Sequence, residues 1–530
     1  MTKIASTFVQ VGERKVLVRH AGRGPALLLL HQSPQSSAAL QPLIERYAGR
    51  CAVFAPDTPG FGQSDPLAMA QPTIPDLAQA LGGLLQALGL QRVLLYGVHT
   101  GALIAARLAQ DQPARVAALV CDGLALFTAQ ERQPLLDGYL PPFEPSWDGT
   151  HLLWLWARVR EQTLFFPWQT GTQAARLAMP LATPEKIHAD VMALLDAGDG
   201  YRAGYRAPLL YTHSRAGAMR LTMPARLLYR DADVLRPHLE RHGTLPPNVQ
   251  ARAVADAAAL VSAMDEVFAE HAASATSVDA AAAAHAAASP RHVRVPLARG
   301  ALAFRCLPNE AGAQSPVEFL IPNIGTPAHP PADRPSGSAA LALELPGHGV
   351  SDPRAEADLT LAMLAADVMQ ALAELKVERV ALRASGGGCA LAAVLAAALG
   401  ARCVSLHLTD PLPLSFAERA QLLSSLPDLH PVATGAHLIA AWNWARLSHL
   451  FWPWRVPDAS AAIAAPAPPP RQVHADAVEM LRAGPCLPAL WQAALSADLP
   501  ALVSALRCPV QITSGEQPEL QRLAARLHSP

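Results

Sequence analysis

The stretch Val93-Leu94-Leu95-Tyr96-Gly97-Val98-His99-Thr100-Gly101-Ala102-Leu103-Ile104 decides the fold of the first half of the chain. It is an apolar run with two glycines, each two residues away from His99. This pattern predicts a buried strand, a sharp turn and then a helix. Because glycine tolerates strained backbone angles and lets a strand and a helix approach closely, such a turn would lift the His99 side chain above the edge of a sheet.

The same stretch resembles the nucleophile elbow, G-x-Nu-x-G, of the α/β-hydrolase fold superfamily. In that superfamily the central residue is usually Ser, Asp or Cys, whereas His99 stands there in this chain. Two interpretations follow. Either His99 takes part in the chemistry, or the elbow has lost its nucleophile and kept its shape. The pattern alone does not choose between them.

Two loops carry the resemblance further. An apolar run ends in His31-Gln32-Ser33-Pro34-Gln35-Ser36-Ser37, which resembles the H-G-x-P-x-S-S loop of the haloalkane dehalogenase and epoxide hydrolase branch. Asp57-Thr58-Pro59-Gly60-Phe61-Gly62-Gln63-Ser64-Asp65 resembles the D-x-P-G-x-G-x-S-D loop of the same family. The resemblance implies an oxyanion hole formed by the backbone N–H groups of Gln32 and Thr100. We expect the imidazole of His31 to pack the turn.

The resemblance also indicates which acid would orient a catalytic histidine. Asp233 follows a predicted strand at the position of the family's triad acid, and Asp122, at the end of another strand, is the alternative. The family's triad histidine would follow about 25 residues later, but residues 249–263 contain none. His99 itself would therefore have to act as a general base or as a nucleophile.

Residues 128–220 interrupt the rhythm of strands with a helical, aromatic-rich segment, which in the superfamily is a cap over the active site. Aromatic side chains of a cap could line an apolar substrate pocket, and a hydrophobic core of the cap explains them equally well. The candidate pocket residues are Trp154, Trp156, Phe165, Phe166 and Trp168.

The second half of the chain repeats the first. Residues 151–168 (HLLWLWARVREQTLFFPW) recur as residues 437–454 (HLIAAWNWARLSHLFWPW), and residues 59–66 recur as residues 346–353. We therefore predict a tandem duplication of a whole domain. The first domain spans residues 1–272 with its cap at about 128–220, an Ala-rich linker spans 273–291, and the second domain spans 292–530 with its cap at about 415–500.

The second domain is predicted to be degenerate, truncated at its carboxyl end and catalytically inactive. Gly386 stands opposite His99, and Pro518 stands opposite Asp233. A shift of register would place Ser385 at the elbow, but Arg383 would then replace the first small residue that the turn requires. We expect this domain to dock on the first domain or on a second copy of the chain.

Composition limits the partners. A net charge of −1 and only 16% charged residues argue against nucleic acid or an anionic membrane as a partner. Apolar runs are too short to span a membrane, and the N-terminus does not read as a leader, so we expect a cytoplasmic protein. Seven scattered cysteines without a C-x-x-C pair predict no metal site, and we expect no cofactor.

These observations predict an α/β fold made of two tandem α/β-hydrolase-like domains, each with a mostly parallel, doubly wound sheet and a helical cap. The predicted function is cofactor-independent hydrolysis of a small apolar substrate, such as an ester, a lactone or an epoxide. The alternative is a non-catalytic pseudoenzyme that binds an apolar ligand or a protein partner.

Overall fold

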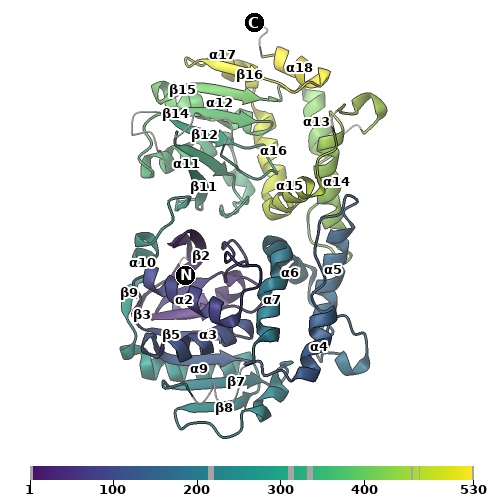
Figure 1. The fold of residues 1–530 in the computed structure, drawn as a ribbon. Coiled ribbons are helices and arrows are strands. Elements are labelled where there is room, and N and C mark those ends of the chain that lie inside the picture. Colours follow the sequence, from purple (N-terminus) through teal and green to yellow (C-terminus); the bar gives the residue numbers. More distant parts are fainter. Residues whose placement is uncertain are drawn as a thin grey trace. The chain divides into compact units, whose positions relative to one another are not determined.

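The computed structural model describes residues 4–212, 220–307, 316–330, 338–454, 457–464 and 466–527. The chain divides into two compact units (Figure 1). The first unit consists of Met1–Glu144 and Leu155–Ser289, and the second of Pro145–Trp154 and Pro290–Pro530. Each unit contains one mostly parallel sheet and many helices, which confirms the predicted α/β class.

The first sheet has the order β1-β2-β4-β3-β5-β6-β7-β8, and β9 pairs with β3. Its first two pairings along this order, β1 with β2 and β2 with β4, are antiparallel, and all later ones in the order are parallel. The strands are β1 Ala5–Val11, β2 Arg14–Ala21, β3 Arg23–Leu30, β4 Ala52–Pro56, β5 Val93–Val98, β6 Val116–Asp122, β7 Ala225–Arg230, β8 Val249–Val254 and β9 Ser277–Asp279.

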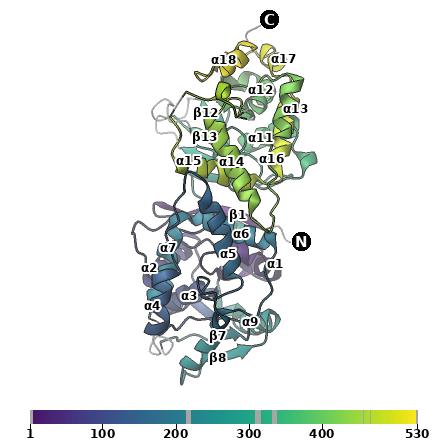
Figure 2. The same cartoon turned by 90° about the vertical axis from the view of Figure 1, so that its right-hand side faces the viewer.

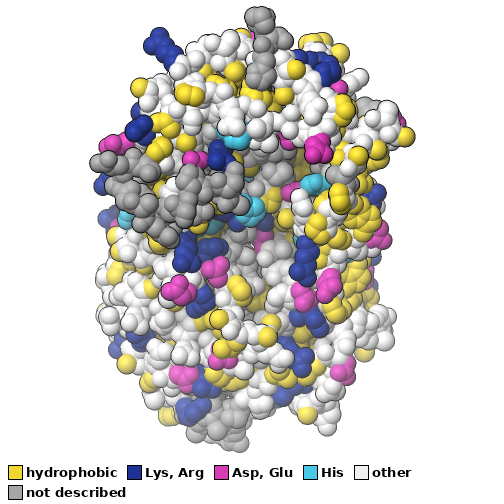
Figure 3. All heavy atoms as spheres, turned by 45° about the horizontal axis from the view of Figure 1, so that its top comes forward, with side chains coloured by type: hydrophobic (Ala, Val, Ile, Leu, Met, Phe, Trp, Pro, Cys, Tyr) yellow, Lys and Arg dark blue, Asp and Glu magenta, His cyan; other side chains and the backbone are white. Residues whose placement is uncertain are grey.

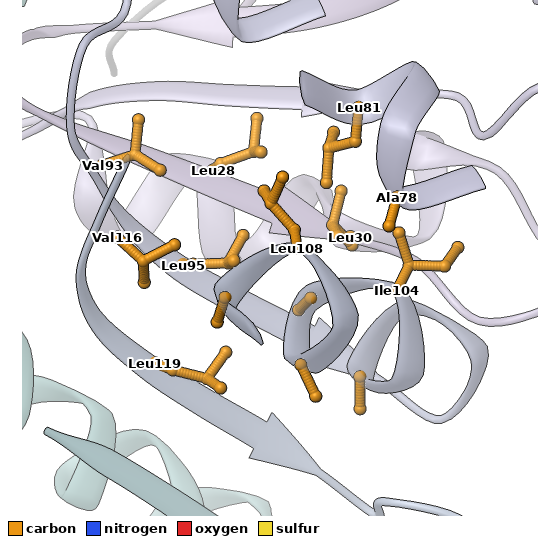
Figure 4. Close-up of a cluster of buried hydrophobic side chains, with 14 of the residues drawn as sticks. Leu28, Leu30, Ala78, Leu81, Val93, Leu95, Ile104, Leu108, Val116 and Leu119 are labelled. Carbon is orange, nitrogen blue, oxygen red and sulfur yellow. The ribbon is translucent and has the colours of Figure 1, made fainter. Parts of the chain in front are cut away.

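Helices cover both faces of this sheet, and the run Ala26–Leu30 shows why. Leu28 and Leu30 pack into one cluster of buried side chains, whereas Leu27 and Leu29 pack into another. Because alternate residues of a strand point to opposite faces, an unbroken apolar run requires cover on both sides. Figure 4 shows the first cluster, in which side chains of α3 lie against the central strands. The helices of the first unit are α1 Gln41–Tyr47, α2 Ile74–Ala87, α3 Thr100–Asp111, α4 Ala129–Gly138, α5 Thr150–Gln162, α6 Pro184–Ala197, α7 Tyr201–Leu210, α9 Ala257–His271 and α10 Ala280–Ala286; α5 begins in the part of the chain assigned to the second unit.

The second sheet has the order β10-β11-β13-β12-β14-β15-β16, which is the order of the first seven strands of the first sheet. A duplication predicts this agreement. The elements are β10 His292–Val295, β11 Leu302–Leu307, β12 Val317–Ile321, β13 Ala340–Glu344, α11 Leu361–Glu374, β14 Val380–Ser385, α12 Gly388–Leu399, β15 Cys403–Thr409, α13 Phe416–Ser424, α14 Ala436–Leu450, α15 Pro470–Ala483, α16 Cys486–Ser496, α17 Leu499–Ser504, β16 Val510–Thr513 and α18 Pro518–Ala525.

A helical insertion separates the same two strands in each unit. In the first unit α4 to α7 lie between β6 and β7, and in the second unit α13 to α17 lie between β15 and β16. Figures 1 and 2 show α14, α15 and α16 together on one side of the second sheet. The insertions start close to the predicted residues 128 and 415, because Thr128 and Ser415 cap the N-termini of α4 and α13.

The Ala-rich segment of residues 273–291, predicted as a linker, has a regular structure. It forms β9, which pairs with β3, and α10, whose Ala280 and Ala284 are fully buried. Two physical reasons account for this regular structure. A strand needs little side-chain volume to pair through its backbone, and alanine fits where a helix lies close to a sheet.

Opposite charges are interspersed on the face of the molecule drawn in Figure 3, in keeping with the net charge of −1. Within the described part of the chain, every helix is too short or too polar to cross a membrane.

The packing of α10 predicts a difference between two substitutions in one helix. Ala284→Glu places a charge in a fully buried position and should lower the free energy of unfolding by several kcal/mol, about 3 or more. Ala281→Glu places the same charge at an exposed position of the first turn and should change it by less than about 0.5 kcal/mol. Urea unfolding of the full chain measures both; equal effects would mean that α10 is a tether.

Candidate active site

The turn between β5 and α3 places His99 at the carboxyl edge of the first sheet. His99 has φ 48° and ψ −106°, and its backbone N–H donates to the carbonyl of Asp122 on the neighbouring strand (2.9 Å). A Cβ at Gly97 would lie 2.2 Å from the carbonyl oxygen of Gly101, and a Cβ at Gly101 would lie 2.4 Å from that of Leu30. Both glycines are therefore needed for the turn, as the sequence predicted.

The imidazole of His99 contacts the carboxylate of Asp233, which follows β7. Nε2 of His99 lies 2.9 Å from Oδ2 and 3.1 Å from Oδ1 of Asp233. The side chain of Asp233 is only 3% exposed, and that of His99 is 26% exposed. Burial alone would raise the pKa of Asp233, but hydrogen bonds from His99 and from the Leu235 N–H, with the charge of Arg230, lower it to about 2.

This contact sets the tautomer of the ring. Because an ionised carboxylate only accepts hydrogen bonds, the neutral imidazole must carry its proton on Nε2. The lone pair then lies on Nδ1, on the other side of the ring. All described hydrogen bonds of the His99 ring are made by Nε2, so Nδ1 is left to accept a proton from water or to attack a substrate.

Arg230 connects the two predicted acids. Its Nη2 donates to Oδ2 of Asp233 (3.0 Å), and its Nε donates to Oδ1 of Asp122 (3.2 Å). The other oxygen of Asp122 accepts a hydrogen bond from the Tyr96 hydroxyl (3.1 Å). Burial raises the pKa of Asp122, and the charge of Arg230 opposes this effect. Asp122 is thus held beside the His99–Asp233 pair, while Asp233 contacts the ring of His99 directly.

Sequence reasoning missed the roles of Arg230 and Tyr96. A signal was present, since Arg230 ends a strand that pairs with the strand of Asp122, and a basic residue between two acids at one sheet edge predicts a bridge.

The loop after β3 holds the predicted oxyanion-hole residues in place. Nδ1 of His31 donates to the Gln32 carbonyl (2.9 Å), and its Nε2 accepts a hydrogen bond from the Thr58 N–H (2.9 Å). Burial lowers the pKa of His31, so its ring is neutral and fixes the loop, as expected. Thr100 is the first residue of α3, where a backbone N–H has no partner within the helix.

A small apolar cavity lies against His99. Its volume is about 60 Å³, and it is lined by Ser33, His99, Thr100, Ala125, Phe127, Leu135, Tyr139, Phe166, Tyr205, Pro208, Leu209, Val234 and Leu235. At about 10–15 Å³ of such volume per water, it holds on the order of four waters. A small acyl or alkyl group fits this space.

The five aromatic residues predicted to line a pocket lie in different surroundings. Phe166 lines the cavity, whereas Trp156 is fully buried and Trp154 belongs to the second unit. Trp168 donates from Nε1 to the Tyr139 carbonyl (3.1 Å), and Phe165 stacks with the guanidinium of Arg176. These four rings therefore serve packing, because close-packed helices leave most aromatic side chains no cavity to face.

Two further histidines of the first unit, His238 and His242, have structural partners. Nδ1 of His238 accepts a hydrogen bond from the Leu126 N–H (2.8 Å), and Nε2 of His242 lies 2.7 Å from the Tyr229 hydroxyl. Burial lowers the pKa of both rings to about 4. Asp256, in the middle of the segment where the family places its histidine, caps the N-terminus of α9.

The second elbow lacks the groups of the first. Gly386 has φ 51°, close to the value of His99, but carries no side chain. The backbone N–H of Gly387, which corresponds to Thr100, donates to Oδ1 of Asn323 (2.9 Å). Arg383 pairs with Glu318 (3.0 Å) at the position before the elbow. Among the described residues of either unit, no group of three His, Cys, Asp or Glu side chains could hold a metal ion.

Parts of this chain are similar in sequence to known proteins. The sequence profile of the alpha/beta hydrolase fold family matches residues 25–170, which include the elbow. An uncharacterized hydrolase of Saccharomyces cerevisiae is 34% identical over 125 residues, which are 23% of this chain and 43% of that protein. Epoxide hydrolase 2 of Siraitia grosvenorii is 37% identical over 123 residues, which are 23% of this chain and 39% of that protein.

A haloalkane dehalogenase of Mesorhizobium japonicum is 28% identical over 236 residues, 43% of this chain and 67% of that protein. The solved structure of the epoxide hydrolase CorEH is 19% identical with a TM-score of 0.39, and the match covers 51% of this chain and 99% of that chain. The chain spans about two fifths of the length of the first two relatives described. The elbow, the parallel sheet and the profile match together place the first unit of this chain in the α/β-hydrolase superfamily.

Proposed function

We propose that the first unit is a cofactor-independent hydrolase of a small apolar substrate, in which His99 acts as a general base oriented by Asp233. The observation that carries this proposal is the 2.9 Å contact between Nε2 of His99 and the buried carboxylate of Asp233, beside a small apolar cavity. A base and the acid that orients it, next to a space for the reacting group, are the minimum for acyl transfer to water.

The reaction proceeds by attack of water on an electrophilic carbon. Nδ1 of His99 takes the proton of the water as its oxygen bonds to the carbon, and Asp233 stabilises the imidazolium that forms. The backbone N–H groups of Thr100, at the N-terminus of α3, and of Gln32 donate to the oxygen that gains negative charge. The imidazolium then returns the proton to the leaving oxygen.

The cavity favours esters, lactones or epoxides with a small acyl or alkyl part. Besides the apolar wall it contains two phenol groups, and the Tyr205 hydroxyl donates to the Tyr139 hydroxyl (3.4 Å). Burial raises the pKa of both phenols, so they remain donors at neutral pH. The Tyr139 hydroxyl, which accepts this hydrogen bond, can donate its own proton to an oxygen of the substrate.

We further propose that the second unit does not catalyse this reaction. It presents Gly386 where the first unit presents His99, and glycine offers neither a base nor a nucleophile. A duplicated domain that lost its catalytic side chain would explain the repeat.

Turnover should depend on His99. A panel of small esters, lactones, epoxides and haloalkanes identifies the substrate, and kcat/KM is then compared between the wild type and His99→Gln. The loss of the base should lower kcat/KM by about 10²-fold or more, because general-base catalysis contributes that much.

Ser385→Ala is the matched control, since it removes the hydroxyl nearest the second elbow, and its kcat/KM should equal that of the wild type. Loss of activity in Ser385→Ala with retention in His99→Gln would overturn the assignment. Equal, unchanged rates in both variants would also overturn the assignment, whereas no turnover of any compound of the panel would favour a protein that binds rather than catalyses.

The charge of Asp233 predicts how stability depends on pH. Its pKa falls from 3.8 to about 2 on folding, so the ionised carboxylate stabilises the native state above pH 4 by about 2 kcal/mol. This contribution disappears as the pH falls through the folded pKa. Asp233→Asn should therefore lower the free energy of unfolding at pH 7, and the difference from the wild type should shrink towards pH 2. Urea unfolding at several pH values measures it; a constant difference would contradict the ionised pair.

A further inference from the structure

The second unit contains a cavity that is much larger than the one beside His99. Its volume is about 500 Å³, and all its lining residues belong to the second unit. It lies at the carboxyl ends of β12, β14 and β15, beneath α14 and α15, at the place that the small His99 cavity occupies in the first unit. A volume of this size is typical of sites for small organic ligands.

Four indole rings form one wall of this cavity. Trp454 lies at the centre of the group, with ring centroids 5.8 Å from Trp444, 4.6 Å from Trp452 and 6.2 Å from Trp491. Trp491 and Trp454 are only 2% and 7% exposed, so the inner rings are fixed by packing. The electron-rich faces of indoles attract cations more strongly than those of other aromatic side chains.

The charged side chains of the wall are acidic. Asp410 and Asp476 line the cavity, and among the described lining residues there is neither Lys nor Arg. Asp410 accepts a hydrogen bond from the Gly515 N–H (2.7 Å), and Asp476 accepts one from Nε2 of His449 (2.8 Å). Carboxylates on a low-dielectric aromatic wall produce a negative potential inside the cavity.

The cavity is not arranged for catalysis. Asn323 already accepts the hydrogen bond of the Gly387 N–H, and its side chain fills the space above Gly386, where a Cβ would lie 2.3 Å from Oδ1. The elbow position of this cavity, Gly386, thus presents no nucleophilic side chain.

We propose that the cavity of the second unit binds a small alkylated ammonium compound, of the chemical class of choline. The indole rings and the two carboxylates hold the cation. This site is independent of the hydrolysis proposed for the first unit.

Binding to the full chain is measured by calorimetry and by tryptophan fluorescence with choline and with 3,3-dimethylbutan-1-ol, its neutral isostere. The two probes have the same shape and the same hydroxyl and differ only in charge. Choline should bind at least about tenfold more tightly, because cation–π contacts in a desolvated site contribute that much. Equal affinities, or no binding of choline in the millimolar range, would overturn the proposal.

Variants locate the site. Trp452→Leu and Asp476→Asn should each weaken choline binding at least about fivefold. Asp190→Asn is the matched control, because Asp190 occupies the corresponding position in the first copy of the repeat, where it pairs with Lys186 (2.6 Å) outside both cavities. Its affinity should equal that of the wild type. The same loss in Asp190→Asn as in Asp476→Asn would also overturn the proposal, and far-ultraviolet circular dichroism shows whether each variant is folded.

Discussion

The contact between His99 and Asp233 depends on three neighbouring strands ending at the same edge of the first sheet. β5 delivers His99, β6 delivers Asp122, and β7 delivers Asp233 together with Arg230. Because the carboxyl ends of parallel strands meet at one edge, residues 134 positions apart in the sequence come within 2.9 Å. The buried Asp233 stays ionised only through the groups around it, so ring, carboxylate and guanidinium stabilise one another.

The contrast between the two units follows from an exchange of side chains. In the first unit a Cβ at Gly123 would lie 2.6 Å from Cδ2 of His99, so the ring requires a glycine beside it. In the second unit the backbone pairing places Asp410 at the corresponding position, next to Gly386, which has no side chain to collide with it. The second unit thus has an acidic cavity where the first has a base.

Much of the fold could be predicted from the sequence, because its signals are local. The glycines around His99, the apolar run Ala26–Leu30 and the gapless repeat of residues 151–168 predict an elbow, a buried strand and a second similar domain. The role of Asp233 was predicted from the family resemblance. The bridge through Arg230 was not predicted, because it depends on which strands become neighbours. The burial of Ala284 and the true lining of each cavity also depend on tertiary packing, which no periodicity records.

The central claim is that Asp233 holds His99 as the tautomer with its proton on Nε2 and a free lone pair on Nδ1. Nuclear magnetic resonance of the ¹⁵N-histidine-labelled protein at neutral pH tests this directly, with the His99 signals assigned by their absence in His99→Gln. In the neutral form of the ring we expect a protonated Nε2 and an unprotonated Nδ1, and we expect this preference to be lost in Asp233→Asn. A ring protonated on Nδ1, or one whose signals are the same with and without the Asp233 carboxylate, would contradict the account.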